Sequence, residues 1–260
     1  IRLSSLSKEW ATFSADVFGA KAHIIYDPNA DRPVYFAVTP ANVNDITAAK
    51  AMPIEAGVTY VYDLGYYDYG WWAAIDDVGG RFVTRLKKNT PFTAVHENRV
   101  PKNGNIVTDR IGHLPARLAV SRKNPLQVPV REIRVIIETG KTLRIVTNDL
   151  DAPAQEIAEL YKQRWQIELF FKWIKQHLRI TRFFGTSENA VKTQSWCAIA
   201  TYVLIAIVKH ERHLDASLHT CLQVLSVSLF EKIDLIGALQ PDRAPPSPLE
   251  TASQFLLFDP

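Results

Sequence analysis

The segment VTYVYDLGYYDYGWWAAIDDVGGRFVTRL, residues 58 to 86, decides the fold class. It begins with the apolar run VTYVYD, which is typical of a buried strand. A loop, LGYYDYG, leads into WWAAIDDVGG, which predicts a helix stopped by Gly79 and Gly80. RFVTRL, residues 81 to 86, is again a strand pattern. The order strand, helix, strand predicts an α/β fold.

The preceding residues predict a hairpin and a helix. AKAHIIYD, residues 20 to 27, alternates before the turn PNADRP, and PVYFAVTP, residues 33 to 40, follows as a second strand. A helix is expected from about Asn44, with Asn44 or Asp45 as its N-cap. The first 90 residues therefore predict one continuous α/β region.

The secondary-structure pattern of the sequence changes twice after this region. From about Thr90 to Asp149, short β-like runs separated by Pro, Gly and Asn indicate a β-rich insertion. Three helical patterns follow, at about 154–178, 188–211 and 215–231, before a tail rich in Pro and Ser. The predicted division is 1–90, the first part of the core; 91–150, the insertion; 151–232, the rest of the core and the C-terminal helices; and 233–260, the tail.

Composition narrows the class of protein. Of the 260 residues, 47% are hydrophobic, which is enough for a substantial core. No uninterrupted apolar run is long enough for a membrane span, and the N-terminus has no hydrophobic signal core, so we expect a globular cytoplasmic protein without a membrane partner. The two cysteines, Cys197 and Cys221, lie in apolar helical patterns, which argues against a disulfide framework or redox chemistry.

A second stretch, YKQRWQIELFFKWIKQHLRITR at 161–182, contains six Lys or Arg but one carboxylate, Glu168. A single helix over 154–178 would form a core stripe of Ile157, Leu160, Ile167, Phe171, Ile174 and Leu178. A bordering stripe would contain Tyr161, Arg164, Glu168, Lys172 and Lys175.

Two interpretations of this stripe remain open. It could be an amphipathic helix with ion pairs from Arg164 to Glu168 to Lys172. Alternatively, Glu168 could be a metal ligand in a groove for a polyanion, with the cations holding phosphates. The best partner for such a ligand is Asp63, which ends an apolar strand at the sheet edge where open α/β sheets place their sites. Asp63 could equally cap the helix that follows it.

Together these elements resemble the DDE insertion-sequence transposases of the Y-R-E-K group, the insertion-sequence-four family. The signature Tyr, two residues, Arg, three residues, Glu, six residues, Lys is met by Tyr161, Arg164, Glu168 and Lys175. The block Asp-x-Gly-aromatic is met by Asp63, Gly65 and Tyr66. Further similarity lies in KAH at 21–23, VND at 43–45, FVTRLKKN at 82–89 and FFGTSENAVKTQ at 183–194.

The resemblance implies a ribonuclease H-like core with a β-rich insertion, followed by C-terminal helices. It also implies two Mg²⁺ ions, for which Mn²⁺ can substitute, in a reaction that cleaves DNA and transfers a strand. Asp63 and Glu168 would be metal ligands, Arg164 and Lys175 would hold phosphates near the transposon end, and Tyr161 would position that backbone. The implied partner is double-stranded DNA, both transposon ends and target, bound by a homodimer in the bacterial cytoplasm at the nucleoid.

Three further residues are candidates for DNA contacts. Arg85 belongs to a basic run without an acid, and Lys172 lies on the signature stripe. Trp165 could stack on a base or pack in the core.

One part of the family pattern is missing. The family's first Asp would fall upstream of Ile1, so we expect a truncated chain with at most two of the three metal ligands. Two other hypotheses remain at this point: a catalytically inactive DNA-binding remnant of a transposase, and an unrelated α/β protein whose Glu168 is only an ion-paired helix residue.

Overall fold

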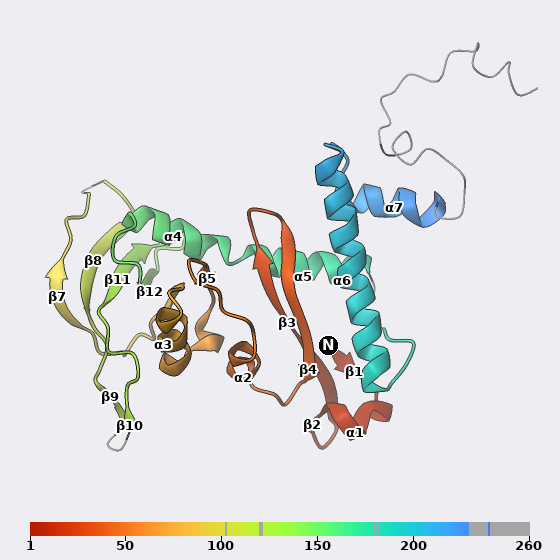
Figure 1. The fold of residues 1–260 in the computed structure, drawn as a ribbon, viewed down its shortest axis with the longest axis horizontal. Helices are drawn as coiled ribbons and strands as arrows, with labels where there is room; N and C mark the ends of the chain where they lie inside the picture. Colours follow the sequence, from red (N-terminus) through yellow and green to blue (C-terminus); the bar gives the residue numbers. More distant parts are fainter. Residues whose placement is uncertain (102, 120–121, 179, 181, 229–238, 240–260) are drawn as a thin grey trace, which may run out of the picture. The chain divides into compact units, whose positions relative to one another are not determined.

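The computed structural model describes residues 1–101, 103–119, 122–178, 180, 182–228 and 239 (Figure 1). The chain divides into two compact units, 1–196 and 197–260, which we describe separately. The boundary falls within one long helix, α6 (Glu188–Glu211).

A mixed six-stranded sheet is the main element of the first unit, with strand order β5-β6-β12-β11-β8-β7. Its strands are β5 (Thr59–Val61), β6 (Arg81–Arg85), β7 (Thr93–Glu97), β8 (Ile106–His113), β11 (Val130–Ile136) and β12 (Thr142–Thr147). β5 and β6 are parallel, and the other neighbours are antiparallel. The α/β class predicted from the sequence is confirmed.

The connection between β5 and β6 passes through η2 (Leu64–Tyr66) and α3 (Tyr69–Asp77). α3 begins where the Asp68 side chain accepts a hydrogen bond from the Trp71 N–H at 2.8 Å. It ends before Gly79, whose φ of 82° is the left-handed conformation that glycine adopts freely. The predicted strand, helix and strand are therefore confirmed.

Two hydrophobic clusters cover the two faces of the sheet. On the face we call the α3 face, the fully buried Trp72 stacks on Phe82 with ring centroids 5.3 Å apart. On the opposite face, which we call the α4 face, α4 (Ala154–Gln163) packs Ile157 and Ala158 against β-strand residues that include Val83 and Ile133. Side chains along a strand point alternately to the two faces, so residues adjacent in sequence pack in different clusters.

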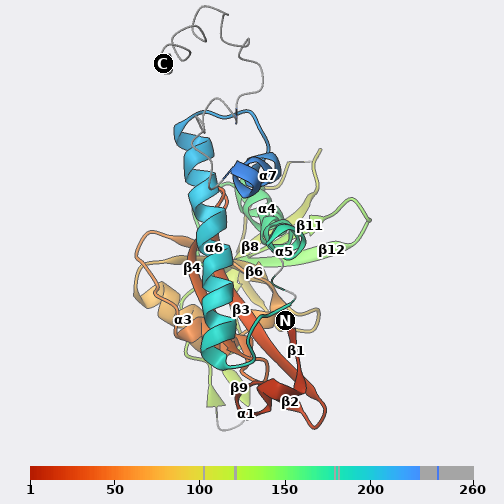
Figure 2. The ribbon, with the colours of Figure 1, turned by 90° about the vertical axis from the view of Figure 1, so that its right-hand side faces the viewer.

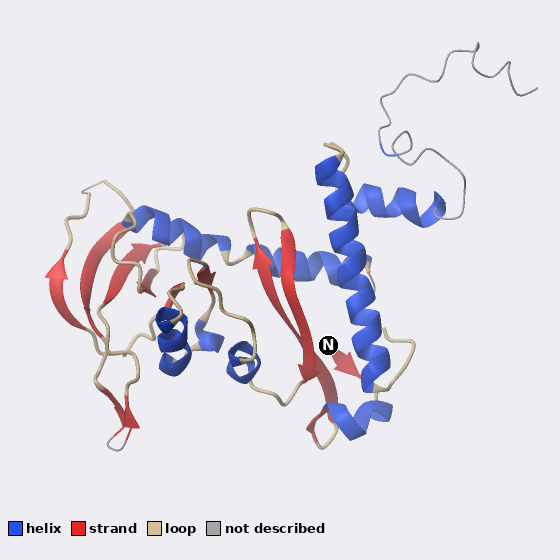
Figure 3. Cartoon of the chain, in the orientation of Figure 1, coloured by secondary structure: helices blue, strands red, loops and turns tan. Residues whose placement is uncertain are grey.

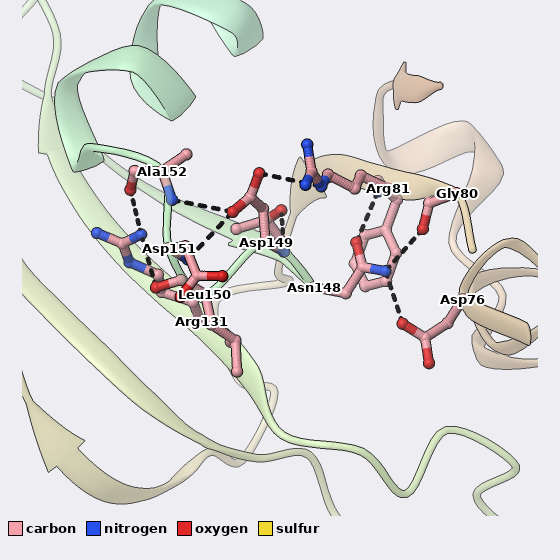
Figure 4. Close-up of polar contacts among 11 residues, drawn as sticks. Asp76, Gly80, Arg81, Arg131, Asn148, Asp149, Leu150, Asp151 and Ala152 are labelled. Carbon is pink, nitrogen blue, oxygen red and sulfur yellow. Dashed lines mark hydrogen bonds and ion pairs between the residues drawn. The ribbon is translucent and has the colours of Figure 1, made fainter. Parts of the chain in front are cut away.

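Buried polar contacts fix the turn that leads from β12 into α4 (Figure 4). Arg131 donates two hydrogen bonds to the Asp109 carboxylate, both at 2.7 Å, and also donates to the carbonyls of Leu150 and Ala152. The hydrogen bond with Asp109 is the largest effect on the Arg131 guanidinium and raises its pKa, although burial opposes this. The pair therefore joins the middle of the sheet to the start of α4.

Asn148 provides a second link at this edge (Figure 4). Its Oδ1 accepts from the Phe82 N–H at 2.8 Å, and its Nδ2 donates to Asp76 at 2.7 Å and to the Gly80 carbonyl at 3.0 Å. One side chain therefore joins β12, β6 and the end of α3.

The Arg131 pair gives a stability prediction. Asp109→Asn leaves a buried guanidinium without its counter-charge, so we expect the free energy of unfolding in urea to fall by about 3–5 kcal/mol. The matched control is Arg81→Gln, which breaks the ion pair of an exposed arginine with Asp149 and should cost less than about 1 kcal/mol. Equal losses in the two variants would contradict this account.

A smaller sheet contains the N-terminal strands (Figures 1 and 2). Its members are β1 (Arg2–Leu3), β2 (Thr12–Ser14), β3 (Val17–Asp27) and β4 (Arg32–Pro40), with η1 (Ser5–Ser7) and α1 (Lys8–Ala11) between β1 and β2. β3 and β4 are antiparallel from Ala20 opposite Pro40 to Asp27 opposite Arg32, which confirms the predicted hairpin.

The helix expected from about Asn44 is α2 (Asp45–Lys50). Of the two candidate caps, Asn44 is the N-cap, because its side chain accepts from the Ile46 N–H at 3.2 Å.

The β-rich texture of residues 91–150 is present, but most of its strands extend an existing sheet. β7, β8, β11 and β12 continue the sheet that β5 and β6 begin. β9 (Arg117–Ala119) and β10 (Arg122–Lys123) form a separate two-stranded ladder. The assignment of this segment as an insertion stays a prediction.

The single helix predicted over 154–178 is wrong in one respect: it is two helices, α4 and α5 (Gln166–His177), separated at Arg164 and Trp165 (Figure 3). At the joint, the N–H groups of Arg164 and Trp165 donate to carbonyls three residues earlier instead of four. This tightened turn changes the relation between the helix faces. In α5, Phe170 and Ile174 are buried, whereas the predicted core residue Phe171 is half-buried.

The second unit begins within α6 and includes α7 (Leu218–Ser228). Ile205, Leu214, Cys221 and Leu239 form its buried cluster. The helix predicted over 215–231 begins at Leu218, and its last residues, together with the predicted tail apart from Leu239, lie outside the described residues. By length and composition α6 could cross a bilayer, a property it shares with core helices of globular proteins.

Candidate functional site

Asp63 lies directly after β5, at the carboxyl edge of the parallel β5–β6 pair. It is half-buried and is the N-cap of η2, because its Oδ1 accepts from the Gly65 N–H at 2.8 Å. Asp63 thus caps a short 3-10 turn and not the predicted helix that follows, because the N-cap of α3 is Asp68. Oδ2 has no hydrogen bond to any residue that the structure describes, so capping leaves one carboxylate oxygen for another ligand.

Glu168 lies in the first turn of α5 with its side chain 65% exposed. Its Oε1 accepts from Arg164 Nη1 at 2.9 Å, an ion pair across the joint between α4 and α5. The predicted pairing of Arg164 with Glu168 is confirmed. Within the described part of the chain, Glu168 makes no ion pair with Lys172, so the second half of the predicted ladder is absent there.

Arg164 connects the two carboxylates electrostatically. Burial opposes its charge, but the hydrogen bond with Glu168 and the nearby charges, including Asp63, raise the pKa of the Arg164 guanidinium. Arg164 therefore forms an ion pair with Glu168 and also feels the charge of Asp63.

Tyr161 lies in the core itself and not on the bordering stripe predicted for it. Its side chain is buried in the cluster on the α4 face with Val83 and Ile133. Burial raises the pKa of the Tyr161 hydroxyl, whereas Arg85 and Arg164 act in the opposite direction. The predicted stripe is displaced because the tightened joint after Tyr161 and the sheet beneath α4 decide which side of the helix is covered. Tyr161 therefore packs between α4 and the sheet.

The remaining candidates lie around this edge. Arg85 ends β6, is half-buried and faces the α4 side together with Val83. Lys172, Lys175 and Trp165 are exposed on or just before α5. Trp165, which could have packed in the core, is instead available to solvent.

Carboxylate oxygens are suitable ligands for Mg²⁺ or Mn²⁺, and Asp63 and Glu168 provide two such groups. Across the described residues, no cluster of three or more His, Cys, Asp or Glu side chains gathers in a way that could hold a metal ion. Asp63 and Glu168 are therefore chemically suitable ligands for a divalent cation, but they supply two carboxylates and not three. In this structure Arg164 provides the counter-charge of Glu168.

One ordered loop was not assigned a role from the sequence, although its residues belong to the motif at 183–194. Gln194 on α6 accepts from the Phe184 N–H at 3.0 Å and donates to the Arg182 carbonyl at 2.7 Å. Ser7 and Trp10 both donate to the Thr186 carbonyl. These contacts hold the loop at both ends and leave the Phe184 side chain fully exposed.

A comparison with protein-family models matches residues 7–204 to the transposase DDE domain. The chain belongs to this family. This DDE transposase domain includes every candidate residue named above, from Asp63 to Lys175, within the matched range.

Curated relatives agree with this assignment. The chain is 37% identical over 238 residues to a putative transposase, y4zB, of Sinorhizobium fredii, covering 92% of this chain and 67% of the relative. It is 31% identical over 198 residues to a probable transposase for insertion sequence element IS5377 of Geobacillus stearothermophilus, covering 75% of this chain and 51% of the relative. The DDE transposase domain thus spans about half to two thirds of the length of these two relatives.

The geometry predicts that Glu168 contributes little to stability. An exposed ion pair between residues i and i+4 on a helix contributes about 0.3–0.5 kcal/mol. We therefore expect Glu168→Gln to lower the free energy of unfolding in urea by less than about 1 kcal/mol. A loss of several kcal/mol would show that Glu168 is a structural residue, and loss of activity in that variant would then carry no information about metal binding.

Proposed function

We propose that this chain is the catalytic region of a DNA transposase, which cleaves phosphodiester bonds at the ends of a mobile element and joins the freed 3′-OH to target DNA. The observation that carries the proposal is the pair of available carboxylates: Asp63 at the carboxyl end of β5, with only Oδ1 used for capping, and the exposed Glu168 paired with Arg164. The membership in the DDE transposase family supports it. The finer assignment to the Y-R-E-K group rests on the spacing of Tyr161, Arg164, Glu168 and Lys175.

In this proposal Asp63 and Glu168 would hold divalent metal ions, Mg²⁺ or Mn²⁺, as two of the carboxylate ligands. Bound metal ions would supply charge stabilisation for in-line attack on a DNA phosphate. Asp63 is oriented for this task by its hydrogen bond to Gly65, which fixes one oxygen and leaves the other free to coordinate. Glu168, on the exposed first turn of α5, can exchange Arg164 for another cation without unfolding the core.

In this proposal the positively charged side chains near this edge of the sheet contact the DNA. Arg164 is a planar guanidinium suited to a phosphate as well as to a carboxylate, so it could pass from Glu168 to the DNA backbone when substrate binds. Lys172 and Lys175 on α5 and Arg85 at the end of β6 surround the carboxylates with positive charge. The exposed Trp165 would stack on a base. Binding as a homodimer on two DNA ends is part of the same proposal.

The test is Mn²⁺-dependent nicking of a duplex that carries the element's end. We expect activity from a version extended upstream through the family's first Asp. Removing a residue that merely orients a metal ligand typically costs 10–100-fold, so we expect Asp63→Asn or Glu168→Gln in that version to reduce the nicking rate by about 100-fold or more.

A matched control tests whether the loss of one negative charge away from the site changes the nicking rate. Glu159→Gln neutralises an exposed glutamate of α4 that contacts only Gln155 among the described residues, and it should leave the nicking rate within about twofold of the parent. If all three variants nick DNA as fast as the parent, the metal-site proposal is wrong. If the extended parent binds DNA but never nicks it, the protein is a DNA-binding module and not an enzyme.

A further inference from the structure

The α3 face of the six-stranded sheet carries a group of arginines that the candidate site does not use. Arg110 on β8, Arg134 on β11 and Arg144 on β12 surround Glu132, and we call this group the arginine patch. Arg110 lies opposite Glu132 in the register of β8 and β11, and Arg134 lies opposite Arg144 in that of β11 and β12. The three arginines therefore come from three adjacent strands of one sheet face.

The patch contains more positive charge than its carboxylate neutralises. Glu132 is fully buried and accepts hydrogen bonds from Arg110 and Arg144. Burial opposes its ionisation, but these two hydrogen bonds lower the pKa of the Glu132 carboxyl, so it is charged at neutral pH. Arg134 Nε lies 3.6 Å from Glu132 Oε1, beyond a good hydrogen bond.

Two donors of the patch have no acceptor within the described residues: Nε of Arg110 and Nε of Arg134. The other carboxylate on this face is the exposed Glu97, which lies opposite Arg110 in β7 and makes no ion pair with it among those residues. Both Nε atoms are themselves buried, so only the exposed parts of the Arg110 and Arg134 side chains are open to an anion.

Arg144 also fixes the loop that borders the arginine patch. Its Nη1 donates to the carbonyls of Lys87 and Lys88, both at 2.9 Å, and of Thr90 at 3.0 Å. The loop after β6 is thereby fixed with two exposed lysines beside the arginines. Lys87 Nζ lies 4.6 Å from the centre of the Tyr67 ring, which restrains it further.

The arginines remain accessible in spite of these contacts. Their side chains are 24%, 38% and 13% exposed for Arg110, Arg134 and Arg144, so Arg134 is both the most exposed and the least neutralised. All three guanidinium groups lie within 3.6 Å of the Glu132 carboxylate, so they form one compact group of positive charge. Guanidinium groups bind phosphate oxygens in a planar, two-point manner.

The patch lies on the opposite side of the sheet from the metal-ligand candidates. Val61 and Val83 face α4, and Asp63 and Arg85 follow them with the same strand alternation. Val130, Val146 and Phe82 face α3, and Glu132 and Arg144 share their side. The patch therefore cannot contact the phosphate that Asp63 and Glu168 would hold.

We propose that the arginine patch binds the phosphodiester backbone of a second duplex DNA segment, separate from the one cleaved at Asp63 and Glu168. The inference rests on the proposed function, because strand transfer requires two DNA segments on one protein. The second segment is then the target, which need not be recognised by sequence. Contacts to phosphates alone provide binding of this kind.

The test compares Arg134→Gln with the extended parent in two assays. In the first, affinity for a duplex without the element's end is measured as a function of salt. We expect binding to weaken by about 3–10-fold and the slope of log K against log salt to fall by about 1, the value for one phosphate contact. In the second, we expect strand transfer into a plasmid to fall by a similar factor, while nicking at the element's end stays within about twofold.

One control and one second test variant accompany Arg134→Gln. Arg81→Gln removes an exposed arginine that Asp149 already neutralises, and it should change neither the salt slope nor strand transfer. The double variant Lys87→Gln/Lys88→Gln alters only exposed loop side chains and should reproduce the effect of Arg134→Gln, which keeps the test valid if the arginine variant does not fold.

Two results would overturn the inference. If the patch variants keep the parent's salt slope, the patch does not bind DNA. If they lose nicking in proportion to strand transfer, both faces hold one DNA segment and no second segment is involved. Neither result affects the proposed function, which depends on the loss of nicking in Glu168→Gln.

Discussion

The parallel pairing of β5 with β6 is the constraint on which the rest of the structure depends. Two parallel neighbours require a crossover, and α3 provides it by burying Trp72 against Phe82. The pairing directs both carboxyl ends to the same edge, so Asp63 and Arg85 emerge side by side. β12, β11 and β8 then extend the sheet from β6, and α4 covers the face that α3 does not.

Charge is organised separately on the two faces of this sheet. On the α4 face, the buried Arg131 is fully paired with Asp109 and serves structure by holding the turn into α4. On the α3 face, Glu132 organises three arginines without neutralising all of them. The same residue types thus give a neutral, structural pair on one side and a basic surface on the other, because the ratio of arginines to carboxylates differs.

Arg164 has a central place at the candidate site. It lies at the joint between α4 and α5, where it pairs with Glu168 and feels the charge of Asp63. This pairing balances the charge of the Glu168 carboxylate. The joint allows Glu168 to project from the exposed first turn of α5, although α4 itself is fixed on the sheet.

The sequence by itself determined the elements of this protein and the identity of the candidate residues. Alternation and turn residues predicted the hairpin of β3 and β4, and the capping and glycine signals predicted α3 and its flanking strands, because these patterns are local. The spacing of Tyr161, Arg164, Glu168 and Lys175 indicated the DDE transposases, and family membership agrees with that resemblance.

Only the tertiary structure decided which side chains are covered. A regular helix of 3.6 residues per turn placed Tyr161 at the border of the core, whereas the tightened turn at Arg164 and packing against Val83 and Ile133 bury it. The joining of β11 and β12 to β6, and hence the gathering of Arg110, Arg134 and Arg144 around Glu132, depends on pairing between strands far apart in the chain. Such pairings leave no local pattern in the sequence, because each strand's alternation is satisfied equally well by several neighbours.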